Sequence, residues 1–79
     1  MQDLADLIGF VAKALVDDPD AVEVKALEGD RTIVIELSVA QEDLGKVIGR
    51  EGRTARAMRT LLAATSARQE RRAILEILE

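Results

Sequence analysis

The sequence predicts a small α+β domain with the element order α–β–β–α–α–β, in which a three-stranded sheet packs on helices. Three patterns lead to this prediction. Apolar residues recur at helical spacing over residues 3–16. Residues 21–28 and 31–39 alternate apolar and polar side chains, as half-buried strands do. A helical stretch interrupted by glycines comes next, and residues 71–79 supply the closing strand.

The first element is an amphipathic helix over residues 3–16. Its aspartates lie near the N-terminal end, where the helix dipole favours negative charge. The helix should stop at the sequence DDPD, because Pro19 disfavours helical geometry at Asp18. The expected core stripe consists of Leu4, Leu7, Ile8, Val11 and Leu15. Phe10 and Ala14 widen this stripe, so part of it is a candidate contact surface for a second protomer.

The two alternating runs form a hairpin. We expect Gly29-Asp30 to be the tight turn between them, because this dipeptide suits short hairpin loops. The expected inward-facing residues are Val22, Val24 and Ala26 in the first strand and Ile33, Ile35, Leu37 and Val39 in the second.

The second half of the chain predicts two helices and one strand. After Ala40 the sequence QEDLGKVI indicates a short helix with acidic residues in its first turn. A longer helix follows from Gly52 to about Ala67, and the polar sequence SARQER connects it to the closing strand. The residues of the longer helix expected to point inward are Ala55, Met58, Leu61 and Leu62.

Composition excludes several kinds of chemistry. With 79 residues the chain has room for one domain. It contains no cysteine and no histidine, which excludes disulfide frameworks, Cys/His zinc sites and histidine-based catalysis. The aspartates of DDPD lack the spacing of a calcium loop, so we expect a solvated turn and no metal. We expect no enzyme activity and no cofactor. The N-terminal sequence shows no leader and no run reaches membrane-spanning length, so we expect a cytoplasmic protein without membrane contact.

Charge is distributed unevenly along the chain. Residues 1–43 hold eleven acids and three bases, a net charge of −8, whereas residues 44–72 hold eight bases and two acids, a net charge of +6. A local basic field on an acidic body is compatible with a nucleic-acid partner despite the overall charge of −4. Phe10 is the only aromatic residue, which disfavours domains that hold RNA by stacking bases on aromatic rings.

The glycines of GKVIGREG indicate a binding site for anions. Gly49 is expected to end one helix in the left-handed conformation, and Gly52 to begin the next. Backbone without Cβ atoms at a helix N-terminus lets a phosphate approach the amide N–H groups. Arg50 lies at the tip, and Lys46, Arg53 and Arg56 lie nearby. The spacing fits neither a P-loop nor a dinucleotide-binding fingerprint.

The sequence VIGREG (47–52) resembles the V-I-G-x-x-G signature of KH domains, whose GxxG loop clamps about four nucleotides of single-stranded nucleic acid. The element order matches the bacterial, type II arrangement. Over AQEDLGKVIGREGRTARAMRTLL (40–62) the chain is similar to the small bacterial KH proteins of the KhpA family. The resemblance implies a single type II KH domain over residues 1–79, with the KH core at about 30–79.

The resemblance also implies a function. It indicates a cytoplasmic RNA-binding protein acting as an RNA chaperone or post-transcriptional regulator. The implied partner is a second KH-containing protein or a second copy of the chain, with links to cell shape and cell wall biogenesis. The residues predicted to bind RNA are Lys46, Val47, Ile48, Gly49, Arg50, Glu51, Gly52, Arg53 and Arg56. Val47 and Ile48, with Ile33 or Ile35, would form an aliphatic floor under the bases. The connector around Arg68 would form the opposite rim.

Two features depart from the KH pattern. Ala55 stands where KH domains often carry a bulky aliphatic residue, and Glu51 places an anion at the loop tip. The competing hypothesis is a protein-interaction module with a KH-like fold, in which RNA binding is incidental. A DNA-binding helix-turn-helix is a third, weaker alternative. The sequence leaves open whether Arg59, Arg68, Arg71 and Arg72 contact RNA.

Overall fold

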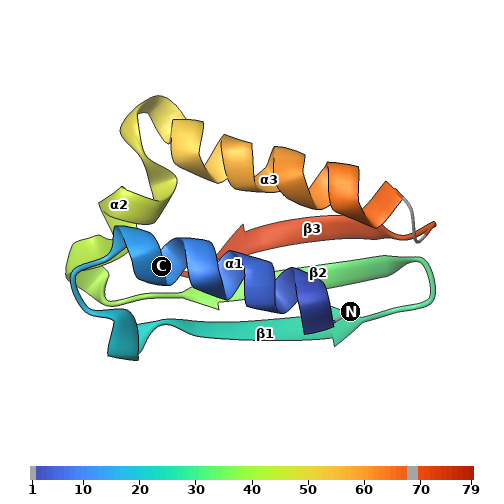
Figure 1. Ribbon diagram of the computed structural model, residues 1–79, viewed down its shortest axis with the longest axis horizontal. Coiled ribbons are helices and arrows are strands. Elements are labelled where there is room, and N and C mark those ends of the chain that lie inside the picture. The colour runs from blue at the N-terminus through green and yellow to red at the C-terminus, as the bar shows by residue number, and fades with distance from the viewer. Residues whose placement is uncertain (1, 68–69) are drawn as a thin grey trace.

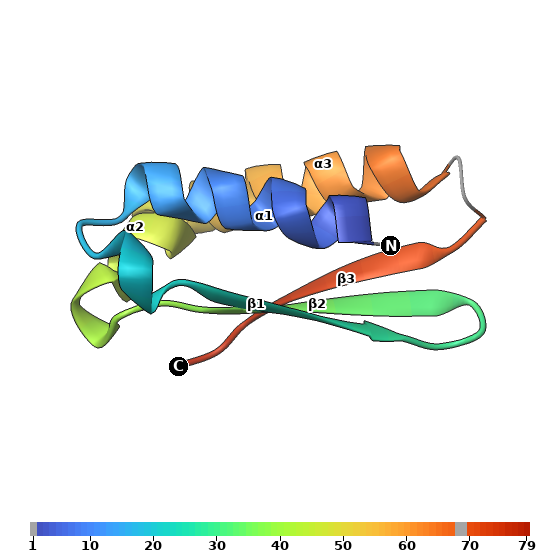
Figure 2. The same ribbon diagram turned by 60° about the horizontal axis from the view of Figure 1, so that its bottom comes forward.

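Helices cover one face of a three-stranded sheet in the computed structural model, which describes residues 2–67 and 70–79. Figure 2 shows the two layers edge-on, with the helices above the sheet. The elements are α1 (Gln2–Leu15), β1 (Glu23–Glu28), β2 (Thr32–Ser38), α2 (Leu44–Ile48), α3 (Arg53–Ser66) and β3 (Arg72–Ile77), with 3-10 turns η1 (Pro19–Ala21), η2 (Gln41–Asp43) and η3 (Arg50–Gly52). The predicted α+β class and α–β–β–α–α–β order are confirmed.

The sheet combines one antiparallel and one parallel pair. Its order is β1-β2-β3, with Ala26 opposite Ile35 and Ile35 opposite Leu75. Parallel strands cannot be joined by a tight turn, and α2 and α3 provide the crossover between β2 and β3. In this strand order β3 forms one edge of the sheet, and it lies beside α3 (Figure 1).

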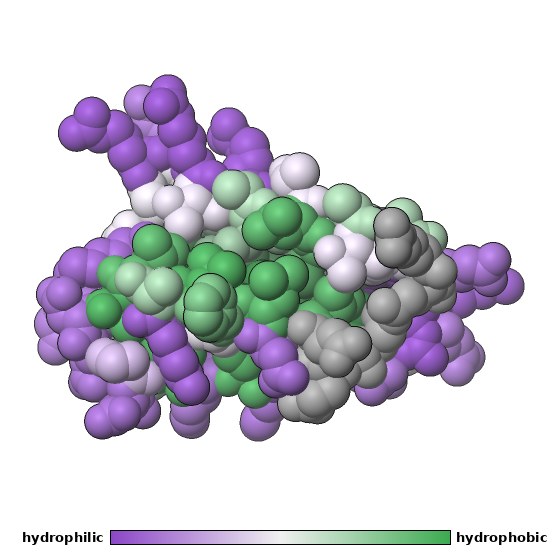
Figure 3. Space-filling model, in the orientation of Figure 1, coloured by the Kyte–Doolittle hydropathy of each residue, from purple (hydrophilic) through white to green (hydrophobic). Residues whose placement is uncertain are grey.

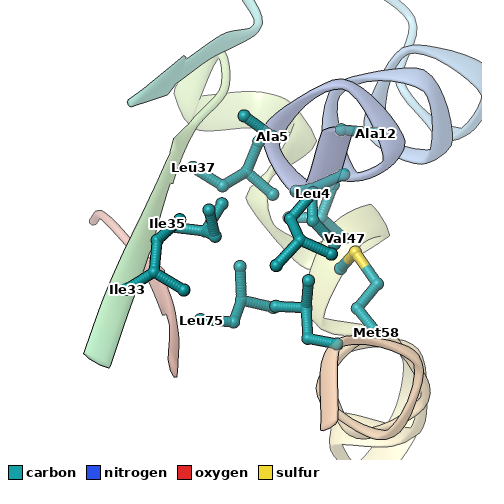
Figure 4. Packing of buried hydrophobic residues seen from close by; sticks show 11 residues of the cluster. Leu4, Ala5, Ala12, Ile33, Ile35, Leu37, Val47, Met58 and Leu75 are labelled. Atoms are coloured by element: carbon teal, nitrogen blue, oxygen red, sulfur yellow. The ribbon is translucent and has the colours of Figure 1, made fainter. Parts of the chain in front are cut away.

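The core lies between the two layers. Leu4, Ile8 and Ala12 recur every four residues along α1 and point at the sheet. Ile33, Ile35 and Leu37 of β2 are fully buried, as their alternation predicted. Figure 4 shows these residues meeting Val47, Met58 and Leu75 from α2, α3 and β3.

Three residues near the core differ from the sequence prediction. Leu15 and Leu61 were expected inside but are 39% and 46% exposed, while Ala5 is buried. In α1 the buried stripe ends at Ala12, one turn before the helix does. In α3 the buried line passes through Met58 and Leu62, and Leu61 is turned from Leu62 by about 100°.

The hairpin turn lies one residue later than predicted. The Gly29 N–H donates to the Thr32 carbonyl at 2.8 Å, so these two residues face each other and Asp30-Arg31 forms the tip. Gly29 is not among the described residues with positive φ, so its conformation does not require glycine.

In residues 2–67 and 70–79, no helix combines the length and apolar character needed to cross a bilayer.

Candidate nucleic-acid interface

The corner between α2 and α3 contains the GxxG sequence. The Gly49 N–H donates to the Gly45 carbonyl at 2.8 Å and closes α2. Gly49 has φ 79° and ψ 169°, a combination that essentially only glycine adopts. The predicted left-handed conformation is therefore wrong at Gly49, because ψ is extended while φ is positive.

Position 49 requires glycine because atoms of Thr54 in the same chain leave no room for a Cβ. A Cβ atom at this position would lie 2.7 Å from the Thr54 Cβ and 2.9 Å from the Thr54 backbone nitrogen. Both distances are shorter than contacts that real Cβ atoms make. The absent side chain at Gly49 thus makes room for the first turn of α3, and the approach of a nucleotide to Gly49 stays a prediction.

Gly52 leaves open space beside the backbone, and its own N–H donates to the Gly49 carbonyl at 3.1 Å. It has φ 73° and ψ 14°, and a Cβ built there would find no atom within 4 Å. Glu51 before it is also left-handed, with φ 57°, so two successive residues turn the chain into α3. The space beside Gly52 lies at the N-terminus of a 14-residue helix, where amide N–H groups attract anions.

The charged side chains of the corner extend into solvent. Arg50, Arg53 and Arg56 are exposed, and Figure 3 shows hydrophilic side chains projecting over α2 and the start of α3. The Glu51 carboxylate lies 4.0 Å from the Arg53 guanidinium, with both side chains more than two-thirds exposed. Glu51 therefore offsets part of the charge of Arg53, while Arg50 forms no ion pair with any residue in the described part of the chain.

Lys46, predicted to bind RNA, is held by two carboxylates. Its Nζ lies 3.2 Å from Asp17 Oδ2 and 3.2 Å from Asp43 Oδ1. These interactions, with Asp43 first, raise the pKa of Lys46. The DDPD turn thus has a structural role at one of its aspartates, and a contact between Lys46 and RNA stays a prediction.

Asp43 joins this cluster to the loop after α1. It is only 2% exposed, and its Oδ2 accepts a hydrogen bond from the Asp18 N–H at 3.1 Å. Burial acts to raise the pKa of Asp43, but the hydrogen bonds from Asp18, Asp17 and Lys46 together outweigh it and the pKa is lowered. An ionised, buried carboxylate therefore fixes the start of α2 against the loop that follows α1.

Replacing Asp43 by asparagine is expected to lower the melting temperature at pH 7 by about 5 °C, because an ion pair and a charge-assisted hydrogen bond are lost. The native pKa lies below the ordinary value of about 3.9. The contribution of Asp43 is therefore complete above that value and is lost as the pH falls through the lowered pKa. Thermal melts from pH 2 to pH 7 should show the two proteins converging in acid. Asp20→Asn is the control, and a pH-independent difference would contradict the prediction.

A groove of about 540 Å³ runs between α3 and the free edge of β3. Its walls come from the C-terminal half of α3 and the N-terminal part of β3, and they comprise Arg59, Ala63, Ser66, Ala67, Arg71, Arg72, Ala73, Ile74 and Leu75. The sequence expected Ile33 or Ile35 to line the floor. This expectation is wrong, because both are fully buried on the central strand β2 and β3 supplies the wall instead.

The two aliphatic residues before the loop differ in exposure. Val47 is fully buried and supports the corner from within the core, whereas Ile48 is half-buried. Only Ile48 therefore has surface to offer a ligand in this conformation. Direct contacts of either residue with RNA stay predictions.

Three arginines that sequence reasoning left open line the groove: Arg59, Arg71 and Arg72. Arg71 Nη1 donates to Glu28 Oε1 at 2.6 Å, and this bond lowers the pKa of the Glu28 carboxyl. The sequence carried no signal for this groove, since AILEIL is apolar at all but one position and does not indicate which helix lies beside the strand. Arg68, predicted to lie on the opposite rim, falls outside the described residues.

Comparison with known proteins gives consistent matches. The family model for the KhpA/KhpB KH domain matches residues 5–77. The RNA-binding protein KhpA of Caldanaerobacter subterraneus subsp. tengcongensis is 52% identical over 75 residues, covering 95% of this chain and 100% of the relative. The RNA-binding protein KhpA of Aquifex aeolicus is 51% identical over 79 residues, covering 100% of both chains. That of Borreliella burgdorferi is 51% identical over 74 residues, covering 94% of this chain and 90% of the relative. The search of solved structures gave no match.

Proposed function

Since the chain belongs to the KhpA/KhpB KH-domain family, we propose that it binds single-stranded RNA as a post-transcriptional regulator or RNA chaperone in the cytoplasm, without catalysis or cofactor. The whole chain acts as one KH domain whose core begins at about residue 30. The observation that carries this proposal is the open space at Gly52, where a phosphate can reach main-chain amides beside exposed arginines.

The loop binds the sugar–phosphate backbone and the groove receives the bases. Amide N–H groups at the start of α3, with Arg50 and Arg53, donate charge-assisted hydrogen bonds to phosphate. Ile48 and the α3–β3 groove provide apolar and edge contacts for bases. One module with few phosphate contacts binds weakly, on the order of the 10⁻⁴–10⁻⁶ M typical of non-specific complexes.

Weak binding by one module creates a need for a second. Two linked sites raise the apparent affinity by effective concentration, without new contacts in either. The partner in this proposal is a second KH-containing protein or a second copy of the chain. Phe10 of α1 and Leu61 of α3 are 74% and 46% exposed, and Figure 3 shows hydrophobic side chains gathered over these helices. The same exposed surface supports the alternative function, a protein-interaction module in which RNA binding is incidental.

The experiment compares a labelled single-stranded RNA octamer with its duplex by fluorescence anisotropy across a salt series. We expect micromolar binding of the single strand and at least tenfold weaker binding of the duplex. About three phosphate contacts give a slope near −2 for log K against log salt. A slope near zero, or equal affinity for both RNAs, would exclude the proposed mode. A folded protein that binds no RNA would favour the interaction module.

A further inference from the structure

Arg59 spans the groove between α3 and β3. Its Nη2 donates to the Leu75 carbonyl oxygen at 3.4 Å, which links the middle of the helix to the edge strand. This distance is long for an N–H···O hydrogen bond, so the contact positions the guanidinium without holding it strongly. Arg59 lies seven positions after Gly52, which is about 10 Å along the helix axis. Arg59 therefore lies where a strand held by the loop would place a base.

The Leu75 carbonyl belongs to the unpaired edge of the sheet. The N–H groups of Arg72 and Leu78 donate to Arg31 and Leu37 on the β2 side, at 2.9 and 2.8 Å. Backbone groups alternate in direction along a strand, so those of Leu75 point away from β2. Without Arg59 this carbonyl would be an acceptor open to a ligand.

Arg59 changes the hydrogen-bonding groups that the edge of β3 presents to a base. It occupies the acceptor at Leu75 and adds a planar set of donors, of which the Leu75 bond uses one. Within residues 2–67 and 70–79 no carboxylate forms an ion pair with Arg59, so its charge is not neutralised there. Of the other two arginines that line the groove, Arg71 already donates to Glu28, whereas Arg72 is exposed and adds donors. Beside Leu75 the groove thus presents donors to a base edge.

A donor-lined groove discriminates between the two purines. Guanine presents two adjacent acceptors, O6 and N7, which an arginine contacts with two hydrogen bonds. Adenine replaces O6 with an amino group, a donor, whose natural partner here is the carbonyl that Arg59 covers. We propose that Arg59 is a specificity-determining residue that makes the groove select guanine over adenine. This inference rests on the proposed RNA-binding function.

The test uses uridine hexamers that carry one guanine or one adenine at each position in turn, with affinities measured by fluorescence anisotropy. The two purines match in size, so their affinity ratio isolates the edge contacts. For the wild-type protein we expect the best guanine hexamer to bind at least about fivefold more tightly than its adenine counterpart. In Arg59→Met, which keeps the apolar stem and uncovers the Leu75 carbonyl, the ratio should fall to one or below.

Arg56→Met is the matched control, because Arg56 is an exposed arginine one turn earlier on the same helix. It should weaken both hexamers alike and leave the ratio unchanged. A wild-type ratio near one, or a ratio that survives Arg59→Met, would overturn the role of Arg59. A wild-type ratio near one overturns the proposal even if a variant does not fold. Failure of the wild-type protein to bind any hexamer would instead defeat the proposed function.

Discussion

Replacing Arg50 and Glu51 together with aspartate is expected to weaken single-stranded RNA binding by about 10- to 100-fold and to shift the melting temperature by less than about 2 °C. The exchange at Arg50 turns a cation at the loop tip into an anion facing phosphate. Both side chains are exposed, and aspartate tolerates the left-handed conformation of residue 51 better than most residues do. The loss of binding is therefore expected in a folded protein.

The matched control for this double variant is Arg31→Asp. It makes the same change in charge at an exposed residue in the hairpin tip, at the other end of the molecule from the GxxG corner (Figure 1). Anisotropy titrations should show less than about a threefold loss for this variant if only long-range electrostatics changes. Equal losses in both proteins would mean that net charge alone controls binding. An unchanged affinity in the double variant would favour the interaction module.

The two loop glycines are expected to differ in their contribution to stability. Gly49→Ala should lower the free energy of unfolding by about 3 kcal/mol, because the new Cβ collides with Thr54 and the backbone is confined to a glycine-only conformation. Gly52→Ala should cost about 1–2 kcal/mol, because only its left-handed conformation opposes a side chain. For a domain of this size the larger loss is a substantial part of the total stability.

Urea unfolding of both variants measures this difference, and RNA titration provides a second comparison. At Gly52 the added methyl group enters the space proposed for phosphate. Gly52→Ala should therefore cost more free energy of RNA binding than free energy of unfolding. Gly49→Ser tests the steric explanation further, since its Cβ meets the same Thr54 atoms. Equal free-energy losses at Gly49 and Gly52 would show that the collision with Thr54 is not decisive.

Local patterns predicted the fold because apolar residues recur at helical spacing in the helices and alternate with polar residues in the hairpin strands. Alternation placed Ile33, Ile35 and Leu37 inside, and the glycines located the corner between α2 and α3. The exposure of Leu61 was not predictable, since a helical stripe two residues wide gives no indication of which edge faces the sheet.

The candidate site was predictable at the loop and not in the groove. The groove needs β3 to lie at the sheet edge beside α3, which is a property of strand order and not of any local pattern. The engagement of Lys46 likewise depends on Asp17, which is distant in sequence. Both features depend on contacts between segments that are distant in sequence, which local patterns do not predict.

The parallel pairing of β2 with β3 has a consequence for how binding competence is acquired. Ile35 and Leu75 are paired although a long segment of chain lies between them. Closing this segment costs conformational entropy before the β2–β3 hydrogen bonds can stabilise the sheet. The α1–β1–β2 portion relies on nearer neighbours. A partly folded intermediate lacking β3 would contain the loop glycines but no wall to receive a base. The proposed contacts with bases should therefore form only after β3 has paired with β2.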